Sequence, residues 1–186
     1  SNYTAFPDPQ NYRIRLEQLA DATVRDRLRL LWTDPLALDP ARASARVTRA
    51  VAKELAELAR SLEAAGHPPQ AVAAFLARCL FSMFAEDIGL LPQDDEGLGG
   101  FVALLTRYRT RPERLTKMLH LLWQGMDTGG PNGALEGDAT LRFNGKIFKG
   151  WNEDGYVLPL TPEQVDGLLR AARANWTEVE PAIFGT

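Results

Sequence analysis

Glu86 and Asp87 are adjacent carboxylates near the end of an almost wholly apolar block that runs from Phe75 to Pro92. Such a pair can bind a divalent metal or act as general acid and base. Arg78 and Ser82 precede Glu86 at intervals of four residues, so one helix face can carry an ion pair or a hydrogen-bonded strut. We expect Glu86 and Asp87 to form a structural anchor, to Arg78 or to backbone amides of the following loop. A hydrolytic site is the alternative.

The common catalytic constellations are incomplete in this chain. His67 and His120 are the only histidines, which leaves little for a histidine-based triad or metal cluster. Neither a G-x-G-x-x-G turn after a strand nor a G-x-x-x-x-G-K-[ST] loop occurs, and no Glu-x-Lys pair of the nuclease type is present. We therefore expect no catalytic, cofactor-binding or metal-binding residue in this fragment.

A basic run with an aromatic residue is the best candidate for nucleic-acid contact. Clustered guanidinium groups around an aromatic ring suit phosphate binding. The candidates for contact with the DNA backbone are Arg107, Arg109, Arg111, Arg114 and Lys117, with Tyr108 among them. A solvated helix end is the alternative, since the net charge of the chain is −3.

The composition indicates an ordinary globular protein. The chain has 186 residues, of which 45% are hydrophobic, enough to bury one sizeable core. No apolar stretch is long enough to span a membrane, and no leader sequence opens the chain. The single cysteine, Cys79, favours a reducing compartment, so we expect a cytoplasmic protein. Residues 1–2 resemble a cloning remnant.

Helical periodicity dominates the rest of the chain. We expect residues 3–186 to form one domain with a mainly α fold, a multi-helix bundle with an irregular or short β-hairpin insertion near residues 140–158 around Asn144-Gly145. Asp39 should cap the second helix, and Thr110 and Thr161 should open capping boxes. The apolar residues of the third helix occupy almost every side, which is typical of the centre of a bundle. The predicted helices are 10–33, 40–65, 69–89, 97–108, 112–124 and 162–177.

Three segments in a fixed order carry a resemblance to a known family. They are the block from Phe75 to Pro92, then Phe143-Asn-Gly-Lys-Ile-Phe148, then Trp176-Thr-Glu-Val-Glu-Pro-Ala-Ile-Phe-Gly-Thr186. Together they resemble the MmeI-like, type IIG/IIL restriction-modification proteins, which are large bacterial DNA methyltransferases. The resemblance spans roughly residues 70–186. Its motif residues with an expected structural role are Arg78, Glu86, Asp87, Asn144, Gly145, Trp176 and Phe184.

The resemblance implies a non-catalytic helical spacer. In that family the three segments lie between an N-terminal nuclease-bearing region and an S-adenosylmethionine-dependent adenine methyltransferase domain. The expected partners are therefore these neighbouring domains and double-stranded DNA, and the expected cofactor of the parent is S-adenosylmethionine. Whether such a parent also cleaves DNA depends on the N-terminal region.

Two departures from the family pattern bear on this interpretation. Lys146 stands where the family usually has a second glycine, and the sequence ends at Thr186, before the methyltransferase motifs of relatives. We interpret the chain as a middle piece whose apolar Ile183 and Phe184 face another domain. The alternative is a stand-alone α-helical protein-interaction module.

Overall fold

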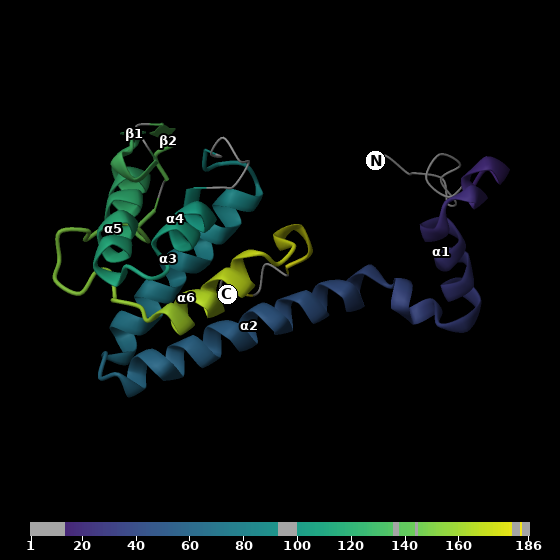
Figure 1. Ribbon diagram of the computed structural model, residues 1–186, viewed down its shortest axis with the longest axis horizontal. Coiled ribbons are helices and arrows are strands. Elements are labelled where there is room, and N and C mark those ends of the chain that lie inside the picture. Colours follow the sequence, from purple (N-terminus) through teal and green to yellow (C-terminus); the bar gives the residue numbers. More distant parts are fainter. Residues whose placement is uncertain (1–13, 93–99, 136–137, 144, 180–182, 184–186) are drawn as a thin grey trace. The chain divides into compact units, whose positions relative to one another are not determined.

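The computed structural model describes residues 14–92, 100–135, 138–143, 145–179 and 183 (Figure 1). By internal contacts the chain forms two compact units, residues 1–43 and 44–186. The fold is mainly helical with one small antiparallel hairpin, as the sequence predicted. No helix in the described ranges combines the length and apolar character needed to cross a membrane.

The first unit contains a 3-10 helix, Leu16–Ala20, the helix α1, Ala22–Thr33, and a second 3-10 helix, Pro35–Leu38. The single helix predicted over 10–33 is broken because Asp21 is extended and caps α1, its carboxylate accepting from the Thr23 amide at 2.8 Å. None of the residues in these three helices is buried, and the Trp32 side chain is 90% exposed. The predicted apolar stripe therefore builds no core within this unit.

The second unit begins within the helix α2, Pro40–Ala64, and continues with α3, Pro69–Asp87, and α4, Gly100–Tyr108. Asp39 caps α2 as predicted, accepting from the Ala41 amide at 3.0 Å. α3 buries seven residues and contacts α4, which confirms its predicted place at the centre of the bundle. The buried residues of α3 are Val72, Phe75, Cys79, Leu80, Ser82, Met83 and Ala85.

The helix α5, Pro112–Thr128, packs on α4 and runs one turn beyond its predicted end. It stops at Gly129, whose φ of 75° is a conformation that favours glycine. The predicted capping box at Thr110 is wrong, because Arg111 is the N-cap residue and no side chain caps the helix there. Pro112 does occupy the first turn, where its missing amide costs nothing.

The hairpin lies earlier in the chain than predicted. Its strands are β1, Gly130–Pro131, and β2, Ala139–Thr140, with Gly130 opposite Thr140 and a short 3-10 helix, Gly133–Leu135, between them. The buried side chain of Asn132 holds the connection by donating to the Leu122 carbonyl at 3.2 Å and accepting from the Ala134 amide at 2.9 Å. Residues 141–143 and 145–159 contain neither strand nor helix, so of the two predictions for the insertion near residues 140–158 the irregular segment agrees with the described residues.

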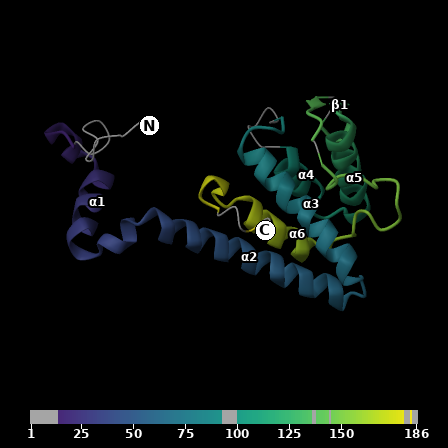
Figure 2. The same cartoon turned by 180° about the vertical axis from the view of Figure 1, so that it is seen from behind.

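The helix α6, Pro162–Ala172, lies beside α2 in both Figure 1 and Figure 2. Thr161 and Gln164 form the predicted capping box at its start. Gln164 also donates to the Ser61 hydroxyl of α2 at 2.8 Å, and Arg170 donates twice to one oxygen of Glu54, at 3.0 and 2.8 Å. After α6 the chain forms a 3-10 turn, Trp176–Glu178.

Candidate site at the motif junction and the basic corner

Arg78 joins α3 to the irregular segment that follows the hairpin. Its Nε donates to the Ile147 carbonyl at 3.1 Å, and its Nη1 donates to the Tyr156 carbonyl at 2.9 Å. The guanidinium carbon also lies 3.7 Å from the centroid of the Tyr156 ring and 5.9 Å from that of Trp123. Partial burial lowers the pKa of Arg78, but an arginine stays charged in proteins. One side chain thus ties two points of an irregular segment to the central helix.

Tyr156 completes this contact. Its hydroxyl donates to the Phe148 carbonyl at 2.7 Å, and its ring meets those of Trp123 and His120 edge-on at centroid distances of 5.9 and 6.0 Å. Burial raises the pKa of Tyr156 to about 12, although the charge of Arg78 acts in the opposite direction. The phenol therefore stays protonated at neutral pH and remains a donor.

Phe81, Phe143 and Phe148 bring two of the resemblance segments into direct contact. The ring of Phe81 on α3 lies 5.7 Å from that of Phe143 and 5.6 Å from that of Phe148, all in edge-to-face geometry. Gly145 has a φ of 131°, a backbone conformation that is strained for any residue with a side chain. Asn144 lies outside the described residues. We call the contacts of Arg78, Phe81, Phe143, Phe148 and Tyr156 the motif junction.

Ser82 forms a buried polar link between α3 and α5. The Trp123 indole donates to the Ser82 hydroxyl at 2.9 Å, and that hydroxyl donates to the Arg78 carbonyl at 2.8 Å. Both side chains are buried, so the Trp123 indole N–H depends on the Ser82 hydroxyl as its acceptor. Ser82 therefore positions Trp123 rather than linking Arg78 to Glu86.

Glu86 caps the helix α4. Its Oε2 accepts from the amides of Phe101 and Val102, at 2.7 and 3.1 Å, in the first turn of that helix. Helix N-termini present unpaired amides and partial positive charge, so a carboxylate is favourable there. The negative charge of Glu86 is unfavourable at the C-terminal end of α3, but it is favourable at the N-terminal end of α4. The sequence predicted an anchor to Arg78 or to backbone amides of the following loop, and the amides that Glu86 accepts from belong instead to the first turn of α4.

Asp87 does not share this role. It is the last residue of α3 and is exposed, which contradicts the prediction of a buried anchor. Within the described ranges, no three His, Cys, Asp or Glu side chains are grouped so that they could hold a metal ion. The two adjacent carboxylates therefore have different surroundings, one bound to a helix start and the other facing solvent.

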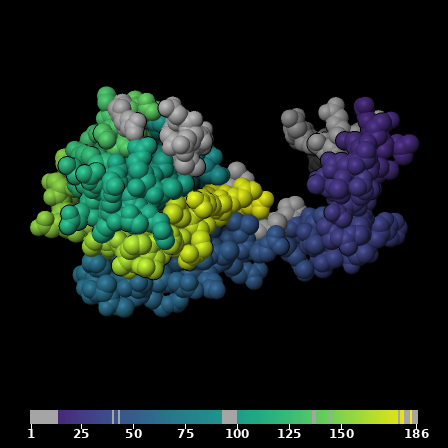
Figure 3. Space-filling view, viewed as in Figure 1, coloured from purple at the N-terminus to yellow at the C-terminus, as the bar shows by residue number. Residues whose placement is uncertain are grey.

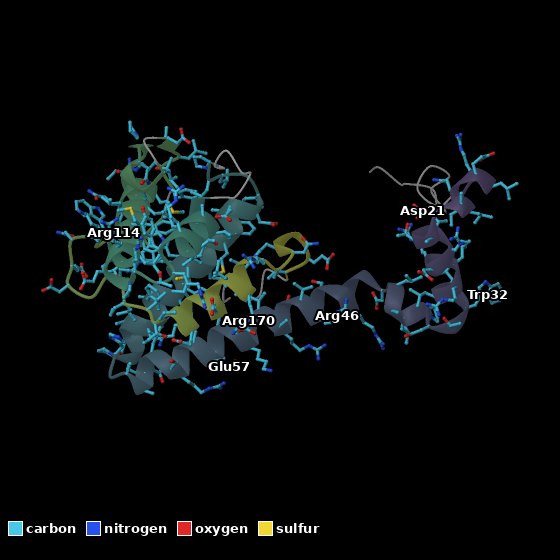
Figure 4. The ribbon with its side chains drawn as sticks, in the orientation of Figure 1. Asp21, Trp32, Arg46, Glu57, Arg114 and Arg170 are labelled. Carbon is cyan, nitrogen blue, oxygen red and sulfur yellow. The ribbon has the colours of Figure 1, made fainter. Side chains whose placement is uncertain are left out.

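The structure places the basic run at the turn between α4 and α5. Arg107 lies in the last turn of α4, Arg111 is the N-cap of α5, and Arg114 and Lys117 follow on α5. Figure 4 labels Arg114. All four are exposed. We call Arg107, Arg111, Arg114 and Lys117 the basic corner. In Figure 3, atoms of α4 and α5 form much of the viewed face of this unit.

Arg109 forms an ion pair with α6. It binds Asp166 of α6 through two parallel hydrogen bonds, Nε to Oδ1 at 2.5 Å and Nη2 to Oδ2 at 2.6 Å. The hydrogen bond from Arg109 lowers the pKa of Asp166, and the same bond raises that of Arg109. Arg109 therefore holds the turn against α6, and its binding fork is already occupied.

The C-terminal resemblance segment is only partly described. Trp176 is buried, and its indole donates to the Ala171 carbonyl at 3.2 Å. Ile183 is half-buried and packs against the core, so within this unit it is partly covered. Phe184 lies outside the described residues.

Sequence reasoning missed the partners of these residues. Tyr156 and Trp123 at the motif junction and Asp166 at the α4–α5 turn carry no spacing signal that links them to Arg78 or Arg109. The acceptors of the two hydrogen bonds from the Arg78 guanidinium are backbone carbonyls, which every residue type supplies. Only the positive φ required at Gly145 has a visible sequence trace, in the Asn-Gly pair.

Among the described residues, the fold and the junction define a helical domain in which Arg78, Glu86 and Arg109 hold separate segments together. Residues 70–148 match the family model described as "MmeI, helicase spacer domain". The match confirms the resemblance over the first two segments, the ones joined at Phe81, whereas Trp176 and the residues after it lie beyond it. Comparison with curated proteins and with solved structures gave no match.

Proposed function

We propose that this chain is the non-catalytic spacer of a bacterial DNA adenine-N6 methyltransferase of the restriction-modification type. It holds neighbouring catalytic domains of the same polypeptide in position and contacts the DNA backbone. The observation that carries the proposal is the match of residues 70–148 to the MmeI spacer domain. In such a parent, a separate domain binds S-adenosylmethionine and transfers its methyl group to a flipped adenine.

The motif junction supports the positioning role. Arg78 fixes two backbone carbonyls 69 and 78 residues further along the chain, and Glu86 fixes the start of α4. A connector between catalytic domains must transmit a fixed geometry, and partly buried charged groups with satisfied hydrogen bonds supply such rigidity. The alternative, a stand-alone interaction module, predicts a reading frame in which Asn/Asp-Pro-Pro-Tyr/Phe and a glycine-rich cofactor loop do not follow codon 186.

The basic corner supports contact with DNA. Its four exposed cations lie on consecutive turns of two joined helices, and arginine binds phosphate through paired donors. Phosphate contacts release counterions, so the affinity should fall steeply with salt. Contacts of this kind carry no sequence information, which agrees with a spacer that leaves recognition to another region.

The experiment is duplex binding by this chain, followed by fluorescence anisotropy from 50 to 200 mM salt. Replacing Arg107, Arg111, Arg114 and Lys117 with alanine should weaken binding. It should also make the negative slope of log K against log salt shallower by roughly 3 to 4. Arg109→Ala, which removes a cation bound to Asp166, is the control and should change the slope little. An unchanged slope in the fourfold variant would exclude this surface.

A further inference from the structure

The exposed face of α2 carries a second row of cations that the proposed function does not use. Arg46, Arg49 and Lys53 follow one another at spacings of three and four residues, so they share one face of the helix. All three are exposed, and Arg46 is labelled on this helix in Figure 4. We call these three residues the α2 row. The opposite face of the same helix buries Val51, Leu58 and Leu62, which keeps the row turned to solvent.

The charges of the row are not balanced by their helix neighbours. The charged residues three or four positions from Arg49 are Arg46 and Lys53, both cations. Only at its end does Lys53 meet an acid, Glu57, at 3.9 Å and with both side chains exposed. Farther along, Glu57 and Glu63 lie three residues to either side of Arg60, so the second half of α2 has the mixed charges of an ordinary solvated helix. Like charges in adjacent turns oppose helix formation, so the first half departs from that pattern.

The surrounding acids do not face the row. Glu54 receives two hydrogen bonds from Arg170 on α6, which commits its carboxylate to the inner side of α2. Ser44, near the start of this unit, donates to the Glu178 carbonyl, and the Glu178 carboxylate accepts from Asn175 at 2.9 Å. The carboxylates of Glu54 and Glu178 are thus both engaged in hydrogen bonds within this unit.

The shape of this face suits a charged backbone. Ala50 and Ala52 are the exposed residues between the cations, so no bulky side chain keeps a partner away from the helix. Arg46 and Lys53 are seven residues apart, roughly 10 Å along the helix axis. Duplex DNA carries one charge per about 3.4 Å of each strand, so three cations over this length can meet neighbouring phosphates of one strand.

We propose that the α2 row binds phosphates of duplex DNA as a second contact surface, separate from the basic corner. This inference rests on the proposed role of the chain as a DNA methyltransferase spacer. Two contact surfaces on one rigid unit fix its orientation on the duplex better than one surface does. The spacer then sets the direction in which attached domains approach the DNA.

The test is duplex binding by the full 186-residue chain, with a 25-base-pair duplex as the probe. Replacing Arg46, Arg49 and Lys53 with alanine should weaken binding roughly tenfold or more at 100 mM salt. It should also make the negative slope of log K against log salt shallower by roughly 2 to 3. The matched control is Arg60→Ala, which removes a cation from the acidic half of the same helix and should leave the slope unchanged. Circular dichroism monitors helix content in each variant.

A charge-retaining variant keeps the test decisive if the alanine variant loses helix. The double variant Arg46→Lys with Arg49→Lys should preserve the salt slope and lose only part of the affinity. The double variant Arg46→Glu with Arg49→Glu should bind the duplex more weakly and with a shallower salt slope. If the corner variant binds weakly and the α2 variants bind like the wild type, the α2 surface is excluded and the proposed function stands. If the α2 variants bind weakly and the corner variant does not, the α2 surface stands without the corner. If the wild type binds no duplex at 50 mM salt, both proposals of DNA contact fail.

Discussion

The Arg78 guanidinium lies 3.7 Å from the Tyr156 ring centroid and also donates a hydrogen bond to the carbonyl oxygen of the same residue. Backbone and side chain of Tyr156 are thereby both held by one residue of the central helix. The Tyr156 hydroxyl in turn holds Phe148, which packs on Phe81 of α3. The segment between β2 and α6 owes its fixed path to these contacts, since where described it has no regular backbone pairing of its own.

Arg78→Ala should lower the free energy of unfolding by about 2 to 4 kcal/mol, because it removes two hydrogen bonds to partly buried carbonyls and the contact with two aromatic rings. Arg78→Lys should recover only part of this loss, since an ammonium cannot donate through the same planar fork. Urea unfolding of both variants measures the effect. Arg114→Ala is the exposed control, and equal stabilities of Arg78→Ala and Arg114→Ala would contradict the clamp.

Glu86 and Asp87 should respond differently to substitution. Glu86→Ala leaves two amides of the first turn of α4 without their acceptor and should cost about 1 to 2 kcal/mol. Asp87→Ala removes an exposed acid from the C-terminal end of α3, where it opposes the dipole, so stability should stay within about 0.5 kcal/mol or rise slightly. Thermal unfolding of the two variants decides the matter. A larger loss for Asp87→Ala than for Glu86→Ala would reverse the assignment.

The pair of Arg109 and Asp166 should make stability depend on acid pH. The hydrogen bond from Arg109 holds the pKa of Asp166 below its ordinary value of 3.8, so the unfolded chain binds the proton more readily than the folded one. The contribution of the pair is present above pH 3.8 and is lost as the pH falls through the lower folded value. Asp166→Asn should therefore flatten the stability profile below about pH 5. Asp87→Asn is the control, and an equally steep profile in Asp166→Asn would show that the pair contributes nothing.

The hydrolytic alternative predicts DNA cleavage by this chain with a divalent metal. We expect no cleavage, because one Glu86 oxygen accepts two amides of α4 and Asp87 faces solvent in a different environment. Incubating supercoiled plasmid with Mg²⁺, Mn²⁺, Ca²⁺ and Zn²⁺ measures this directly. Cleavage that disappears in Glu86→Gln would establish the hydrolytic site.

Much of the fold follows from patterns in the sequence, and the partners at the site do not. The apolar surface of α3 and the caps at Asp39 and Thr161 arise from local rules. Arg78, by contrast, shares an i, i+8 face with Glu86, yet Ile147 and Tyr156 supply its acceptors from a segment without periodicity. No sequence pattern identifies such acceptors, because every residue supplies a backbone carbonyl.

The hairpin and the first helix show the same limit. Asn144-Gly145 has the composition of a tight turn, but the flanking aromatic residues pack on Phe81 instead of pairing as strands. The hairpin forms at Gly130 and Thr140, where the buried Asn132 side chain stabilises the connection. In the first unit, Asp21 is both a good cap and a helix breaker, so the periodic stripe from Leu16 onward is interrupted.

The most direct test of the central claim is methyl transfer by the protein expressed from the whole reading frame. Radiolabelled S-adenosylmethionine and duplex DNA are the substrates, and product nucleosides are separated to identify the labelled base. The account predicts label on adenine N6, and a higher KM for DNA with an unchanged kcat when Arg107, Arg111, Arg114 and Lys117 are replaced with alanine. A reading frame that gives no methyl transfer, and that lacks the Asn/Asp-Pro-Pro-Tyr/Phe motif, would contradict it.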